Sequence, residues 1–109
     1  MRSRLEGIVD WNERLPRADW RADALARGCG VSERELRRYV RAVFGLSLRD
    51  WIAAARMERA RALLQRGDMV KEAAARLGYS QAGNFSRAFG RRHGTSPAAF
   101  RRGAAAYSI

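Results

Sequence analysis

Arginines recur every three or four residues in the first half of the chain, a spacing that places them along one side of a helix. The residues are Arg34, Arg37, Arg38 and Arg41. An arginine guanidinium donates paired hydrogen bonds to phosphate oxygens and to the acceptor edge of guanine. Such a face is often only a solvated surface. If the helix enters a DNA groove, we expect Arg34, Arg37 and Arg38 to contact base edges and Arg41 to contact phosphate.

Polar side chains in the second half of the chain offer similar chemistry. We expect Asn84 and Arg87 to contact bases, because an asparagine amide can bond an adenine edge in two places and arginine suits guanine. Serine hydroxyls near helix N-termini suit phosphate, although capping the helix is an equally good role for them. The residues expected at the DNA backbone are Ser32, Arg41, Ser80, Gln81, Ser86 and Arg91.

The composition limits the possible functions. The formal net charge of +11, from 22 basic and 11 acidic residues among 109, favours a polyanionic partner. A single cysteine and a single histidine provide no disulfide, no metal-ligand cluster and no nucleophile with its base, so we expect no enzyme, cofactor or metal. No segment reaches the roughly 20 consecutive apolar residues of a membrane span, so we expect a cytoplasmic protein without a membrane partner.

An internal repeat organises the chain. The segment 25–32 (LARGCGVS) aligns with 73–80 (AAARLGYS) at an offset of 48 residues. After one extra residue in the second copy, 36–47 aligns with 85–96 at an offset of 49, so that Arg38 falls on Arg87 and Phe44 on His93. Two copies are too few for a stacked solenoid, so the repeat indicates a duplicated supersecondary unit.

Each copy has the punctuation of two helices joined by a tight turn. Gly30 and Gly78 can take the left-handed conformation that ends a helix, and Ser32 and Ser80 can start the next helix as N-caps. Ser32 and Glu35 have the spacing of a capping box. The buried stripes expected on the second helices are Leu36, Tyr39, Val40 and Val43 in the first copy and Phe85, Ala88 and Phe89 in the second.

Helical patterns also flank and join the copies. Ser47 and Asp50 predict a capped helix that ends at about residue 65 and, at about 1.5 Å per residue, spans roughly 27 Å. That length approaches the roughly 34 Å between successive major-groove faces of DNA. Asp68 can cap a short helix over about 69–77, and a closing helix starts at Ser96–Pro97. The stripe of an opening helix before Pro16 comprises Leu5, Ile8, Val9, Asn12 and Leu15.

These elements predict an all-α fold of about seven helices, with two homeodomain-like helix-turn-helix subdomains in tandem. The expected limits are 1–46 for the first subdomain, 47–66 for the linker helix and 67–109 for the second subdomain. His93 is expected to pack, as its repeat equivalent Phe44 does. Most aromatic side chains fall at helical core positions, so we expect them to pack rather than to stack on bases: Trp11, Trp20, Tyr39, Phe44, Trp51, Phe85, Phe89 and Phe100.

The chain resembles the AraC/XylS family of transcriptional regulators in the segments 78–80 (GYS), 85–89 (FSRAF), 94–97 (GTSP) and 100–101 (FR). The first copy and the joining helix add matches at Trp20, Gly30, Arg38, Gly45 and Arg56, among others. The resemblance implies two helix-turn-helix subdomains that each insert their second helix into the major groove. In many relatives an effector-sensing or dimerisation domain precedes such a module, whereas a minority stand alone.

Together these features predict a sequence-specific, double-stranded DNA-binding transcriptional regulator that inserts two recognition helices into adjacent major-groove segments. We expect an activator that contacts RNA polymerase, with repression left open, and an isolated domain that is a monomer even if a longer parent protein dimerises. The alternative is a non-specific nucleic-acid-binding or packaging protein. Arg34, Arg37 and Arg38 favour the first copy as the main reader of sequence, while the second copy, with 11 basic and 3 acidic residues over 51–109, adds non-specific affinity.

Overall fold

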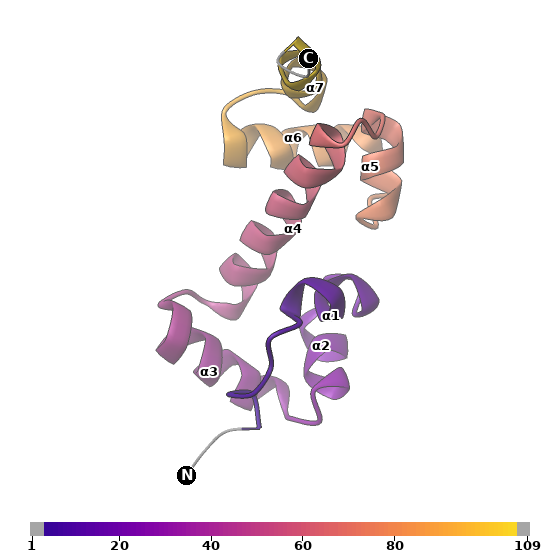
Figure 1. Cartoon of the computed structure of the whole chain (residues 1–109). Helices are drawn as coiled ribbons and strands as arrows, with labels where there is room; N and C mark the ends of the chain where they lie inside the picture. Colours follow the sequence, from indigo (N-terminus) through magenta and orange to yellow (C-terminus); the bar gives the residue numbers. More distant parts are fainter. Residues whose placement is uncertain (1–3, 107–109) are drawn as a thin grey trace. The chain divides into compact units, whose positions relative to one another are not determined.

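The computed structural model describes the backbone of residues 4–106 and the side chains of residues 4–103. Within this range the chain forms helices and no strands (Figure 1). The prediction of an all-α fold of about seven helices is therefore confirmed. The helices are α1 (Trp11–Arg17), α2 (Ala22–Gly28), α3 (Glu33–Phe44), α4 (Leu48–Gln65), α5 (Val70–Arg76), α6 (Ala82–His93) and α7 (Pro97–Ala106).

The helices form two compact units that divide between Ala55 and Arg56, inside α4. In the first unit α2 packs against α1 and α3, and in the second unit α5, α6 and α7 pack against one another. The fully buried side chains of the first unit include Leu5, Leu15, Leu25, Leu36 and Val40, and those of the second include Leu64, Leu77, Phe85, Phe89 and Pro97. Among the described residues, no helix has both the length and the apolar composition needed to cross a bilayer.

Glycines end the helices as the repeat predicts. Gly30 and Gly78 have φ values of 70° and 83° after α2 and α5, and Gly45 and Gly94 have φ values of 70° and 72° after α3 and α6. Only glycine takes this left-handed conformation without steric cost. At the end of α3 and α6 the glycine N–H donates to the carbonyl four residues earlier, which closes both helices in the same way.

The N-cap predictions are right at some helices and wrong at others. Ser32 and Ser47 accept hydrogen bonds from the third residue after each of them, at 3.1 Å. The N-cap of α6 is Gln81 rather than Ser80, because the extra residue of the second copy lies in the turn and shifts the start of α6 by one position. Asp68 does not cap α5 either: the N-cap is Met69, whose N–H donates to the Glu72 side chain, while Asp68 pairs with arginines.

The opening helix is shorter and later than predicted. Residues 4–7 form a turn that buries Leu5, α1 starts only at Trp11, and Val9 is 92% exposed. The apolar types at these positions mimic a helical stripe that the backbone does not follow. The helix also extends past Pro16, because proline removes a single backbone bond near the end while Ala18 N still donates to the Arg14 carbonyl.

The repeat extends further than the sequence comparison indicated, since α1 has the same role in the first unit as the end of α4 has in the second. After α1, Trp20 N donates to the carbonyl of Leu15, and after α4, Asp68 N donates to the carbonyl of Leu63, 48 residues later at both ends. Leu15 and Leu63 are both buried. One continuous helix therefore closes the first unit and opens the second.

The aromatic side chains are less buried than predicted. Trp20, Phe85 and Phe89 lie in the core, but Val43 and Phe44 are 54% and 42% exposed at the end of α3. Trp11, Tyr39, Trp51 and Phe100 are half-buried. The packing role of His93 is confirmed: its half-buried ring lies 4.5 Å from that of Phe89 and stacks on Phe100, as the equivalent Phe44 stacks on Trp51.

Candidate nucleic-acid interface

Helix α3 presents a basic surface on the side opposite its buried residues. Leu36 and Val40 are fully buried and anchor the helix in the first unit. Ser32 fixes its start by accepting from Glu35 N. The opposite side carries only exposed side chains, namely Glu33, Arg34, Arg37, Arg38 and Arg41. The four arginines predicted to meet DNA therefore share one solvent-exposed face.

The arginines of this face differ in whether their guanidinium groups already form hydrogen bonds or ion pairs within the protein. Arg37 pairs with Glu33 at 3.5 Å, and Arg41 donates to the carbonyl of Gly45 at 3.5 Å. Among the described residues, no hydrogen bond or ion pair engages Arg34 or Arg38. These two guanidinium groups can bind a ligand without first breaking a contact, and the face as a whole lacks enough carboxylate to neutralise it.

Helix α6 presents the equivalent surface of the second unit. Phe85 and Phe89 are fully buried, whereas Gln81, Asn84, Arg87 and Arg91 are exposed and Ser86 is half-buried. The Arg87 guanidinium donates to the side-chain oxygen of Asn84, so the two residues predicted to contact bases form one hydrogen-bonded pair. Ser80 is exposed in the turn before the helix and caps nothing.

The family model described as a helix-turn-helix domain matches residues 25–103. The chain belongs to the AraC-type family of helix-turn-helix transcriptional regulators. The family and fold are those of DNA-binding regulators, which are not enzymes. No curated protein matches the chain in sequence.

Solved structures of AraC-type domains share this fold. The DNA-binding domain of AdpA, a global transcriptional factor solved in complex with a target DNA, is 28% identical, with a TM-score of 0.77 and coverage of 98% of this chain and 97% of that one. The C-terminal domain of AraT, a response regulator from Geobacillus stearothermophilus, is 31% identical, with a TM-score of 0.71 and coverage of 93% and 88%. An AraC-type regulator from Chromobacterium violaceum, 23% identical with a TM-score of 0.71 and coverage of 88% and 92%, agrees in fold.

Several arginines of this AraC-type domain hold its helices in place rather than facing outward. Arg56 donates to the carbonyl of Leu77 from Nε at 3.0 Å and from its terminal nitrogen at 2.6 Å, at the end of α5. Arg101 of α7 donates to the carbonyls of Asp68 and Gly67. These structural roles were not predicted from the sequence, because each hydrogen bond joins residues more than 20 positions apart, although both arginines lie at positions that carry the family resemblance.

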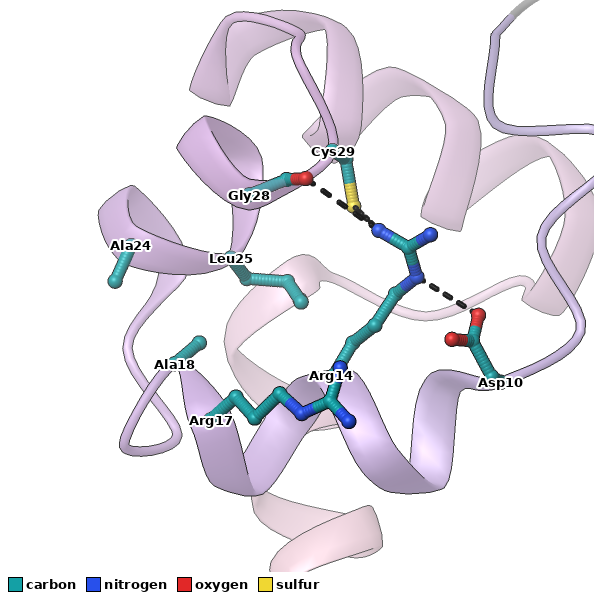
Figure 2. A pocket seen from close by; sticks show the side chains of 8 residues that line it. All are labelled: Asp10, Arg14, Arg17, Ala18, Ala24, Leu25, Gly28 and Cys29. Carbon is teal, nitrogen blue, oxygen red and sulfur yellow. Dashed lines mark hydrogen bonds and ion pairs between the residues drawn. The ribbon is translucent and has the colours of Figure 1, made fainter.

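Arg14 has a similar role in the first unit, where it crosses a cavity of about 230 Å³. Figure 2 shows its guanidinium between Asp10 and the end of α2, where it donates to Asp10 at 2.8 Å and to the Gly28 carbonyl at 3.4 Å, with the Cys29 sulfur 3.9 Å away. The contact ties α1 to the end of α2, just before the turn that leads to α3. The cavity is lined by Asp10, Arg14, Arg17, Ala18, Ala24, Leu25, Gly28 and Cys29.

Carboxylates away from the two basic faces are neutralised by their own arginines. The hydrogen bond from Arg14 holds the pKa of Asp10 below its ordinary value, and the hydrogen bond from Arg66, with the charge of Arg76, does the same for Asp68. The pKa of Asp23 is lowered by the N–H of Ala24 and by Arg21. These carboxylates stay ionised beside a cation, so each is already neutralised by an arginine of its own unit.

Proposed function

We propose that this AraC-type domain binds double-stranded DNA sequence-specifically, with α3 and α6 as recognition helices in adjacent major-groove segments. The observation that carries the proposal is the exposed, unengaged pair Arg34 and Arg38 on a helix whose opposite side is fixed in the core. Arginine forks of this kind bond the N7 and O6 of guanine. The similarity to the AdpA domain, whose structure contains a target DNA, supports the same ligand here.

The proposed base contacts are Arg34, Arg37, Arg38, Asn84 and Arg87, and the proposed backbone contacts are Ser32, Arg41, Ser80, Gln81, Ser86 and Arg91. Selection from random duplexes, followed by titration of the selected and a scrambled duplex at two salt concentrations, tests the function. Specific binding predicts a preference that persists at the higher salt. A steep salt dependence without any preference would instead identify a non-specific packaging protein.

We also propose that the bound domain activates transcription by contacting RNA polymerase through apolar side chains at and just after the end of α3. Val43, Phe44 and Leu46 are 54%, 42% and 39% exposed, whereas the second unit has Arg92, His93 and Thr95 at the equivalent positions. The second unit therefore folds with polar side chains at the positions equivalent to Val43 and Leu46. In transcription assays with purified polymerase, Val43→Ser combined with Leu46→Thr should retain DNA affinity and lose activation; unchanged activation would exclude this surface.

A further inference from the structure

The side chains of Arg87 and Asn84 are coupled on the exposed side of α6. The guanidinium of Arg87 donates to the side-chain oxygen of Asn84, three residues earlier. Residue 83 is a glycine, and a Cβ built there would lie 3.7 Å from a terminal nitrogen of Arg87. The guanidinium is thus folded back over the first turn of the helix, next to a position that has no side chain to compete with it.

The first recognition helix has no such arrangement. At an offset of 49 residues, Gly83 corresponds to Arg34, and Arg87 to Arg38. A long charged side chain therefore stands where α6 has open space, and no hydrogen bond among the described residues holds Arg38. The same backbone position carries an independent arginine in α3 and a positioned arginine in α6.

This coupling changes what the two side chains can recognise. An asparagine reads adenine by accepting from N6 and donating to N7, which requires its oxygen. In α6 Arg87 already occupies one of the two lone pairs of that oxygen, so the pair presents mainly the N–H donors of Arg87 and of the Asn84 amide. Guanine offers two acceptors at its major-groove edge, whereas adenine offers one acceptor and one donor.

We infer that Asn84 and Arg87 act as one guanine reader, in which Arg87 contacts the base and Asn84 is a positioning residue. This inference rests on the proposed function and replaces the expectation that Asn84 reads an adenine. Holding the guanidinium before binding reduces the conformational freedom that Arg87 loses on the DNA. The second unit then specifies one base pair strongly rather than two base pairs moderately.

A double-mutant cycle on the selected duplex tests the inference, with each base pair of the second half-site varied in turn. Arg87→Ala should reduce the preference for guanine at one position by roughly 5- to 140-fold. Asn84→Ala should reduce the preference at that same position by roughly 2- to 12-fold, the effect of freeing one long side chain. The double variant should be no less selective than Arg87→Ala alone.

Two further variants complete the test. Asn84→Asp keeps an acceptor for Arg87 and should retain the guanine preference while weakening binding to all duplexes alike. Arg38→Ala in the other unit is the matched control, and its effect should add to that of Asn84→Ala. Additive effects of Asn84→Ala and Arg87→Ala at two different base pairs, or loss of an adenine preference in Asn84→Ala, would overturn the inference. A wild-type domain without any sequence preference would instead overturn the proposed function.

Discussion

The guanidinium of Arg56 lies 3.9 Å above the centre of the Tyr79 ring and donates both of its hydrogen bonds to one carbonyl, that of Leu77. Leu77 is the last residue before the turn and Tyr79 follows the turn glycine. Arg56 therefore fixes the two ends of the turn that leads to α6. An arginine of the long helix α4 thus holds the turn that precedes α6.

Replacing Arg56 should destabilise the second unit. Arg56→Ala is expected to lower the free energy of unfolding by about 1–3 kcal/mol, because a buried carbonyl loses a charged donor and the ring loses its cation. Arg56→Lys should recover only part of the loss, since an ammonium cannot reproduce the planar fork. Urea unfolding followed by circular dichroism measures the effect. The control is Arg59→Ala, an exposed arginine of the same helix, and an equal loss there would exclude the proposed role.

The two serines at equivalent positions of the repeat should behave differently. Ser32→Ala removes the N-cap of α3 and should lower the free energy of unfolding by about 1 kcal/mol. Ser80 caps no helix, so Ser80→Ala should change the free energy of unfolding by no more than about 0.5 kcal/mol. Thermal unfolding of both variants checks this difference. DNA titration then separates the roles: a phosphate contact predicts weaker binding to every duplex for Ser80→Ala as well, and unchanged affinity would remove Ser80 from the backbone contacts.

Gly90 inside α6 and Gly94 directly after it should respond to alanine substitution with stability changes of opposite sign. Gly90 lies inside the helix, and a Cβ there would be 3.9 Å from the Thr95 carbonyl oxygen, an ordinary contact. Gly90→Ala should therefore stabilise the domain by about 0.5–1 kcal/mol. Gly94→Ala should destabilise it by about 1–2 kcal/mol, because φ is 72° at that position. Chemical denaturation of both variants gives the two signs, and a loss in Gly90→Ala would show that the Thr95 loop cannot accept the methyl group.

Asp68 should make stability depend on acidic pH. Its carboxylate accepts from Arg66 at 2.7 Å and lies 3.1 Å from Arg76, so its pKa is lowered from the ordinary value of 3.8. The stabilisation is fully present above the pKa of the unfolded state and is lost as the pH falls through the lowered value of the folded state. Melting temperatures of wild type and Asp68→Asn should therefore differ at pH 7 and converge in strong acid. Arg66→Gln should weaken the same dependence, and curves that remain parallel would contradict the assignment.

The arginines of α3 should separate into base and phosphate contacts. Arg38→Ala is expected to cost about 1–3 kcal/mol of binding free energy on the selected duplex and to relax the preference at one base pair. Arg41→Ala should weaken binding to all duplexes and make the salt dependence shallower. Titrations with single-base variants distinguish the two patterns. A uniform loss in Arg38→Ala would reassign that arginine to the DNA backbone.

Local signals predicted most of the helices correctly. Helix ends are set by hydrogen bonds between residues at most four positions apart and by glycine in the left-handed conformation, as at Ser32, Ser47 and Gly45. Both signals can be recognised from residue types and spacing alone. The predicted start of α1 was wrong for two reasons. Val9 is apolar but exposed, and Leu5 is buried although it lies in a turn, where helical periodicity does not apply. The predicted N-cap of α6 was one residue too early because Ser80 matches Ser32 in type, whereas the extra residue of the second copy lies between Ser80 and the helix.

The candidate interface was predictable as a face but not as a set of contacts. Burial of Leu36 and Val40 leaves the arginines of α3 on the opposite side, which helical spacing alone predicts. The pairing of Arg87 with Asn84 depends on rotamers and on the space left by Gly83, and spacing does not specify these. The role of Arg56 joins residues 21 positions apart, beyond the reach of any local pattern.

The shared helix α4 makes the duplication an overlapping one. The residues of α4 complete one unit and begin the other, so no loop lies where the two units divide. A protease cut or an insertion at that point would break backbone hydrogen bonds of a helix that both units require. Isolating either unit would mean giving each its own copy of α4. A change in length is therefore easier to accommodate in the turns, where the second copy already carries one residue more than the first, than within α4.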